Sequence, residues 1–184
     1  MIFLFIFLAI IILPLILVIT TYNSLQRKKV AVDEGWSSIG TVLQQRNDLI
    51  PNLVETVKGY AKHESTTLTE VTKWRNQSAS SHSPEEQNVA QYGFQRAMAN
   101  VFAIAENYPQ LKADAQFMQL QLQLTDIEEK LNSTRRIYNS NVKDYNTQLV
   151  VFPANMIAGH FNLKAAVFFE EEEQAKANPK VSFN

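Results

Sequence analysis

The chain opens with a continuous apolar segment, and this segment limits its fold more than any other feature. Residues 2–19 contain no polar or charged side chain, and the first charged residue is Arg27. Such a length matches the ~20 residues that a helix needs to cross a hydrocarbon layer of about 30 Å. The large apolar residues outweigh the single proline, Pro14. We therefore predict a transmembrane anchor formed by Ile2, Phe3, Leu4, Phe5, Ile6, Phe7, Leu8, Ile10, Ile11, Ile12, Leu13, Leu15, Ile16, Leu17, Val18 and Ile19.

A cleaved signal peptide is the alternative interpretation of this segment. It would need basic residues before the apolar run and small residues before the cleavage site, and the chain has neither. Arg27, Lys28 and Lys29 follow the span directly, so the positive-inside rule places the C-terminal part in the cytoplasm. We expect a single-pass protein of the inner (cytoplasmic) membrane, with the lipid bilayer as its first partner.

The composition of the chain excludes several classes of function. The 17 basic and 18 acidic residues nearly cancel, so no overall positive field would gather nucleic acid. The absence of cysteine excludes disulfides, thiolate metal sites and a cysteine nucleophile. Only five glycines and six prolines occur, which permits long helices and disfavours a turn-rich β fold. These counts favour an all-α protein.

Apolar residues after Val30 repeat every seven positions and predict one helix face. One column contains Trp36, Leu43, Ile50, Val57 and Val71, and the other contains Ile39, Leu53, Tyr60 and Trp74. Arg46, Glu64 and Thr67 are polar exceptions in these columns. Pro51 lies inside the segment and removes a backbone hydrogen bond to residue 47, so the helix either kinks there or divides in two.

Two further helices follow in the sequence. Ser83, Pro84 and Glu86 form a capping pattern that predicts a helix start, and Pro109 predicts its end. The last helix keeps a three-four spacing of seam residues from Phe117 to Phe152, most of them apolar, with Thr134, Asn141 and Gln148 as polar members. Long helices joined by short turns predict an elongated antiparallel up-and-down bundle, with four helices if the first breaks near Pro51. The predicted segments are an anchor (1–26), a bundle (27–169) and an acidic tail expected to be disordered (170–184).

The search for reactive groups predicts a protein that is not an enzyme. None of the three histidines, His63, His82 and His160, has a second metal ligand at helical spacing. His63-Glu64 matches half of a zinc-protease motif, but residue 67 is threonine and the second histidine is missing. We therefore predict no catalytic residue, no metal and no cofactor.

Five residues are candidates for an interaction site. Arg46 and Asp48 lie near Pro51, and Arg46 occupies an apolar column. Arg46 either makes a polar contact at an oligomer seam or extends its charge out of the bundle into solvent. Tyr138 and Tyr145 lie one heptad apart and share a face. They are interpreted either as packing residues with a satisfied hydroxyl or as ligand contacts.

The chain resembles the LemA family from the membrane segment to about Phe169. The resemblance is carried by Tyr22-Asn23 with Arg27, Asp48–Tyr60 with His63-Glu64, Glu106–Pro109 with Leu111-Lys112, Leu124–Asp126 with Glu128, Arg135-Arg136 with Tyr138-Asn139 and Tyr145-Asn146, and Phe152-Pro153 with Ala158-Gly159. It implies an up-and-down bundle of four helices and favours a boundary near Pro51. It implies no enzymatic activity and no catalytic residue, and links the chain with membrane-bound metalloproteases and envelope-stress proteins.

Three functions compete at this point. The first is a non-catalytic scaffold or adaptor that forms homo-oligomers in the membrane and recruits other membrane proteins, including a membrane-bound metalloprotease or another envelope protein. The second is a small-molecule or signal sensor, in which a ligand binds between helices. The third is a hydrolase, which would require metal-dependent turnover that disappears in a His63→Ala variant.

Overall fold

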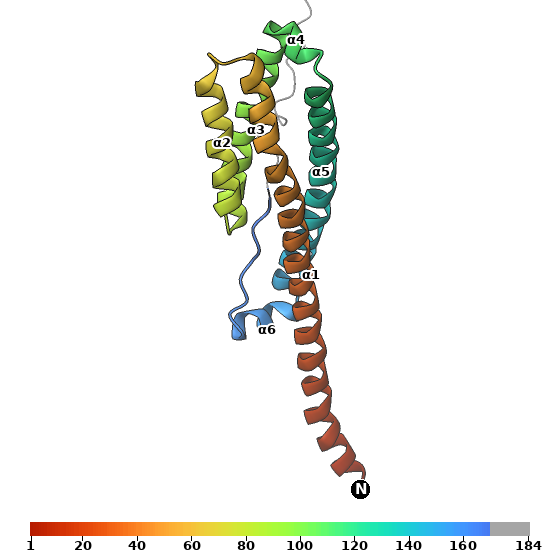
Figure 1. Ribbon diagram of the computed structural model, residues 1–184. Coiled ribbons are helices and arrows are strands. Elements are labelled where there is room, and N and C mark those ends of the chain that lie inside the picture. Colours follow the sequence, from red (N-terminus) through yellow and green to blue (C-terminus); the bar gives the residue numbers. More distant parts are fainter. Residues whose placement is uncertain (170–184) are drawn as a thin grey trace, which may run out of the picture. The chain divides into compact units, whose positions relative to one another are not determined.

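The computed structural model of the protein describes residues 1–169, and every regular element in that range is a helix (Figure 1). The helices are α1 (Ile2–Tyr60), α2 (Ser65–Ser80), α3 (Pro84–Asn107), α4 (Pro109–Lys112), α5 (Ala115–Val150) and α6 (Ala154–His160). The predicted all-α class is confirmed, since no strand occurs in the described part. The predicted acidic tail, residues 170–184, lies outside the described residues.

The described chain divides into two compact units, and α1 and α5 contribute residues to both. The first unit contains residues 1–38 and 134–168. The second contains residues 39–133 together with Phe169. Each unit has its own set of packed residues.

The first unit packs α1 against the C-terminal part of α5 and against α6. Gly35 of α1 permits a close approach, because a Cβ at this position would lie 3.3 Å from the Cα of Tyr138. One residue further, the rings of Trp36 and Tyr138 have their centroids 5.7 Å apart. Nearer the N-terminus, Leu25 is fully buried in a small cluster with α6 residues. In this unit α1 therefore packs on α5 at a small residue, Gly35, and on α6 through the apolar side chain of Leu25.

The last long helix ends earlier than its sequence pattern predicts. α5 stops at Val150, so Phe152 does not continue the seam and is 78% exposed. Pro153 then precedes the short helix α6. The chain after α6 runs back along α5, where the Asn146 side chain donates to and accepts from the backbone of Ala166, both at 2.8 Å. The side chain of Asn146 therefore satisfies both backbone polar groups of Ala166 and holds this segment against α5.

The second unit is a bundle of α1 (from Ile39), α2, α3 and α5 (to Ser133), with α4 as a turn between the last two. The chain direction alternates from each long helix to the next in Figure 1. The antiparallel up-and-down order predicted from the sequence is thus present in this unit. Its core consists of Ile50, Leu53, Val54, Val57, Ala61, Leu68, Val71, Phe94, Ala97, Met98, Val101, Ile104, Ala105, Leu111, Phe117, Leu120 and Leu124.

The start of α3 follows the predicted capping pattern. The Oγ of Ser83 accepts a hydrogen bond from the backbone N–H of Glu86 at 3.2 Å, and Pro84 occupies the first helical position. The Glu86 carboxylate in turn accepts from the backbone N–H of His82 at 2.9 Å. These bonds satisfy donors that a helix start would otherwise leave unpaired.

The first helix breaks after Tyr60 rather than near Pro51. α1 is continuous through Pro51, and the connection to α2 consists of residues 61–64. Buried Ile50 and Leu53 pack on either side of the proline and hold the helix together. Two of the polar exceptions in the heptad columns were the missed signal: Glu64 is the N-cap of α2, and Thr67 lies in its first turn.

Candidate functional site

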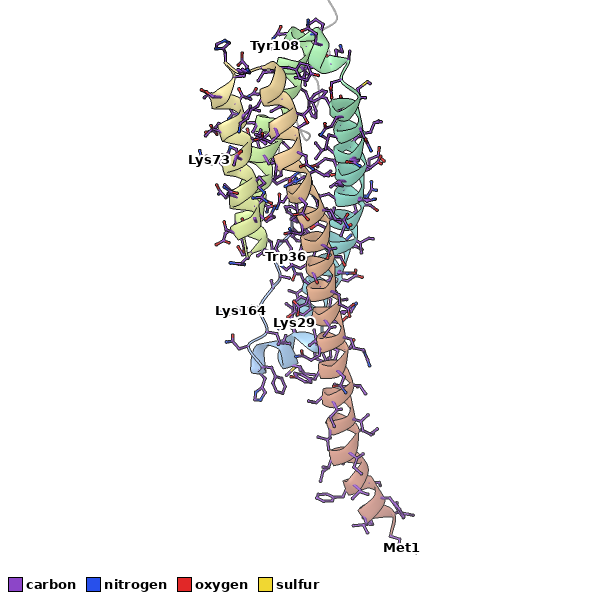
Figure 2. The ribbon with its side chains drawn as sticks, viewed as in Figure 1. Met1, Lys29, Trp36, Lys73, Tyr108 and Lys164 are labelled. Atoms are coloured by element: carbon purple, nitrogen blue, oxygen red, sulfur yellow. The ribbon has the colours of Figure 1, made fainter. Side chains whose placement is uncertain are left out.

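The apolar segment at the start of α1 lacks contacts with the rest of the chain. Every large apolar side chain of residues 2–19 is exposed, and packing begins only at Thr21 and Tyr22. Among residues 1–169, α1 is the one helix long and apolar enough to cross a membrane. Figure 2 shows Met1 at the free end of this helix. Exposed apolar side chains around a whole helix are what a lipid-facing span requires.

Arg46 lies inside the second unit, with its side chain fully buried. Its Nη1 donates to the Oε1 of Gln91 at 2.5 Å and to the Oε1 of Glu128 at 3.0 Å. Its Cζ lies 3.9 Å from the centre of the Phe94 ring. The interpretation that this arginine extends into solvent is therefore wrong. All three partners belong to the same chain.

Small polar side chains extend the contacts of this arginine. The Oγ of Ser78 accepts from Nε2 of Gln87 at 2.9 Å and from Nη2 of Arg46 at 3.5 Å. We call Arg46, Ser78, Gln87, Gln91 and Glu128 the Arg46 network; it joins α1, α2, α3 and α5. Taking a guanidinium out of water is costly unless its donors are hydrogen-bonded. The network therefore favours the one arrangement of the four helices in which these donors are paired.

The partners of Arg46 were not singled out from the sequence, although a signal for two of them exists. Gln87 and Gln91 are four residues apart and share the buried face of α3 with Ala90 and Phe94. Two amides on an apolar helix face predict a polar partner on a facing helix. Glu128 gives a weaker signal, because its side chain is 32% exposed and lies at the edge of the α5 core face.

Two of the predicted interaction residues lie on the surface of the same unit. Asp48 is exposed and accepts a hydrogen bond from Nε2 of Gln44 one turn earlier, at 2.7 Å. Pro51 is also exposed. The carbonyl oxygen of Asn47, which Pro51 leaves without its helical donor, accepts from Nε of Arg75 at 3.2 Å.

Tyr138 and Tyr145 belong to the first unit and are both buried. The Tyr138 hydroxyl donates to the carbonyl oxygen of Val167 at 2.7 Å, which agrees with the interpretation of a packing residue with a satisfied hydroxyl. Burial, and secondarily the charge of Asp33, raise the pKa of Tyr145. Asn141, which the sequence placed in the seam without a role, donates to the carbonyl oxygen of Ala31 at 2.9 Å. These side chains tie the elements of the first unit together.

A groove of about 410 Å³ lies between α3 and α5 in the second unit. It is lined by Phe94, Gln95, Met98, Ala99, Phe102, Leu124, Thr125, Glu128 and Asn132. Its volume falls in the range of small-molecule pockets, about 300–1,000 Å³. The groove borders the Arg46 network through Phe94 and Glu128. It offers apolar contact and one carboxylate already paired with Arg46.

The three histidines lie in different parts of the chain. His63 lies between α1 and α2, His82 lies between α2 and α3, and His160 ends α6; all three are exposed. Within residues 1–169, no group of three or more histidine, aspartate or glutamate side chains is arranged to hold a metal ion.

Comparison with known proteins gives one family and a small set of relatives. The model of the LemA family matches residues 35–183. Protein LemA of Metamycoplasma hominis is 24% identical over 155 residues, which cover 82% of this chain and 69% of that protein. Magnetosome protein MamQ of Magnetospirillum gryphiswaldense is 23% identical over 180 residues, which cover 84% of this chain and 64% of that protein.

A shorter match exists with magnetosome protein MamQ 1 of Paramagnetospirillum magneticum, which is 26% identical over 80 residues. The match covers 44% of this chain and 29% of that protein. The chain thus spans less than two thirds of each magnetosome relative. The family match begins after the apolar segment and includes the residues of the Arg46 network.

Proposed function

We propose that this chain, which belongs to the LemA family as its motifs predicted, is a non-catalytic single-pass membrane protein that assembles with itself and acts as a scaffold or adaptor. The observation that carries the proposal is α1, which joins an exposed apolar span to the packed residues of both units in one unbroken helix. A bundle attached in this way stays at the membrane surface. Anchoring also confines collisions between copies to two dimensions, so weak lateral contacts add up through effective concentration.

Exposed apolar side chains on the second unit are suited to such lateral contacts. Leu122 of α5 is 67% exposed, and Met118 lies one turn before it on the same face. On α3, Val89 and Tyr92 form a second exposed apolar pair. Exposed apolar patches of this kind are typical of interaction surfaces. We infer that these pairs contact other copies of the chain or partner membrane proteins.

The expected location follows from the anchor and from the charges after it. Arg27, Lys28 and Lys29 favour a cytoplasmic position for the bundle at the inner (cytoplasmic) membrane. Partners of the proposed scaffold are membrane-bound proteins, with a metalloprotease or another envelope protein as the expected class. Relatives named magnetosome proteins are consistent with work at a membrane.

Disulfide crosslinking in native membranes tests self-assembly. The chain has no cysteine, so single variants Leu122→Cys and Tyr92→Cys report on one position each. Ala79→Cys, at an exposed position on α2, serves as the control. We expect oxidant to produce dimers at position 122 or 92 and much less at position 79. If all three variants remain monomeric in membranes that retain the protein after alkaline washing, the self-assembly proposal is wrong.

A second candidate function, a sensor bundle, is supported by the groove between α3 and α5. An Ala99→Phe variant would fill the groove without replacing a residue of the Arg46 network. Native mass spectrometry of protein extracted from membranes would then compare the two forms. A bound small molecule that is present in the original protein and absent in Ala99→Phe would favour the sensor. If the masses of the two forms differ only by the change from alanine to phenylalanine, no ligand is bound and the scaffold is favoured.

A further inference from the structure

The short helix α6 is held against α1 immediately after the apolar span. Ala154, Ile157 and Ala158 of α6 form a buried cluster with Leu25 of α1, and Tyr22 packs on the same cluster. The ring of Tyr22 also contacts that of Phe161, with centroids 4.5 Å apart. Figure 1 shows α6 beside α1 where the free part of α1 begins. The contacts fix the level of α6 along the helix axis.

That level corresponds to the headgroup region of a bilayer. Residues 2–19 extend about 27 Å at ~1.5 Å per residue, close to the hydrocarbon thickness of about 30 Å. Tyr22 and Leu25 then lie roughly 5 and 9 Å beyond Ile19 along the axis. The interfacial layer on each side of the hydrocarbon is about 5–8 Å thick, so Tyr22 lies within it and Leu25 just at its outer edge. A helix that packs on Tyr22 and Leu25 therefore lies at the membrane surface.

Large apolar side chains are exposed on α6 and on the residues that flank it. Phe152 is 78% exposed, Met156 68% and Phe161 47%, and Val150 and Val151, which precede Phe152 in the chain, are exposed as well. Such a group of large apolar side chains is typical of an interaction surface rather than of a solvated loop. This surface is continuous with the apolar span of α1 through Tyr22, which contacts Phe161.

The charges around α6 also suit a lipid surface. No acidic residue occurs between Asp144 and Glu170, whereas Lys164 follows α6. Figure 2 shows Lys164 and Lys29 near α6. Anionic lipid headgroups attract such side chains, and a stretch without carboxylates avoids repulsion from them.

We propose that Phe152, Met156 and Phe161 insert into the headgroup region of the bilayer and make α6 a second, interfacial membrane contact next to the transmembrane span. The proposal rests on the proposed insertion of α1, because α6 reaches lipid only if residues 2–19 cross the membrane. These three side chains, from α6 and the residues that flank it, would be buried in the boundary between headgroups and acyl chains. Two attachment points would also restrict tilting of the first unit at the membrane surface.

Fluorescence quenching by spin-labelled lipid tests this contact in the full-length protein. Single cysteines replace Met156, Ile11 in the span and Lys143 on the exposed surface of α5 in the same unit. Each variant receives an environment-sensitive fluorophore and is reconstituted into vesicles of phosphatidylcholine and phosphatidylglycerol. The quencher is carried either near the headgroup or near the end of the acyl chain. A parallel set in phosphatidylcholine alone measures the contribution of anionic headgroups.

We expect the label at Met156 to emit at shorter wavelength than that at Lys143, and to lose several-fold more fluorescence with the headgroup-level quencher. The label at Ile11 should respond mainly to the deeper quencher. In the Phe152→Asp background, the label at Met156 should lose much of its response while that at Ile11 keeps it. The aspartate replaces a side chain that is 78% exposed, so the fold should tolerate it.

The outcomes separate the possible failures. A quenched label at Ile11 with an unquenched label at Met156 would overturn the interfacial contact and leave the anchor intact. An unquenched label at Ile11 would overturn the anchor itself, and with it the proposed function. Disulfide-linked dimers formed through cysteine at position 156, without quenching by lipid, would assign this face to a second copy instead.

Discussion

Nε of Arg75 on α2 donates a hydrogen bond to the backbone carbonyl oxygen of Asn47 on α1, at 3.2 Å. In an uninterrupted helix this carbonyl would accept from the N–H of residue 51, but residue 51 is proline and has no N–H. A side chain from the neighbouring helix therefore replaces the lost backbone bond. This contact explains how α1 passes through Pro51 as a continuous helix.

The first prediction concerns this replacement. Pro51→Ala should raise the free energy of unfolding by roughly 1–3 kcal/mol, because an interior proline costs about 3 kcal/mol relative to alanine and part of that is already offset. Arg75→Ala should lower it by about 1 kcal/mol in the original protein. In the Pro51→Ala background the same change should cost less, since the restored N–H satisfies the carbonyl. Urea unfolding followed by circular dichroism measures all four forms. Strictly additive effects would contradict the replacement.

The second prediction concerns the Arg46 network. Arg46→Met should destabilise the second unit by about 2–4 kcal/mol, because Gln91 and Glu128 lose a charged partner inside the bundle. Adding Glu128→Gln should recover part of this loss, since an unpaired carboxylate is then removed. Arg96→Met, at an exposed position on α3, is the matched control and should change stability by less than about 0.5 kcal/mol. Equal losses at positions 46 and 96 would mean that the network does not stabilise the bundle.

A third prediction uses two glycines of the second unit. A Cβ on Gly93 of α3 would overlap the indole ring of Trp74 on α2, whereas nothing lies near the corresponding position at Gly40. Gly93→Ala should therefore destabilise the protein by about 1–3 kcal/mol and shift the tryptophan emission. Gly40→Ala should stabilise it by roughly 0.5–1 kcal/mol, because alanine favours the helix and meets no clash. Thermal unfolding with fluorescence detection compares the two. Stabilisation at both positions would show that α2 and α3 do not pack in this way.

The fourth prediction concerns pH. The Asp114 carboxylate accepts from the backbone N–H of Phe117 and from the Tyr60 hydroxyl, both at 2.8 Å, and these bonds lower its pKa. A carboxylate with a lower pKa in the folded state stabilises that state above its unfolded pKa of about 3.9. The stabilisation is lost as the pH falls through the folded value. Stability, measured by urea unfolding across the acid range, should therefore decline on acidification, and less steeply in Asp114→Asn, which keeps a capping oxygen but cannot ionise.

The same hydrogen bond raises the pKa of Tyr60. Its contribution is complete below the unfolded pKa of about 10 and is lost as the pH rises through the folded value. Tyr60→Phe should thus flatten the alkaline side of the stability profile. Asp48→Asn, at an exposed carboxylate that accepts from Gln44 on its own helix, is the control and should keep the acid dependence of the original protein.

Local patterns were enough to predict α3 and most of α5, because the features that start and bury them lie close together in the chain. The cap formed by Ser83 and Glu86 spans four residues, and the apolar stripe that ends at Pro109 repeats within two turns. The family was also predicted from short motifs and is confirmed by the match over residues 35–183. The sequence left open whether Pro51 kinks or divides the first helix. The helix continues to Tyr60, since a proline is a strong local signal but removes only one backbone bond.

What the sequence determined by itself is the all-α class, the apolar span and the family, since each depends on residues that are neighbours along the chain or along one helix. The partners of Arg46, the acceptor for Arg75 and the position of α6 beside Tyr22 were decided only by the tertiary structure. In each of these three contacts, a side chain is covered or hydrogen-bonded by a residue that is distant in the sequence. Periodicity shows that such a face must be covered, but only the packing of several helices together decides which residue covers it.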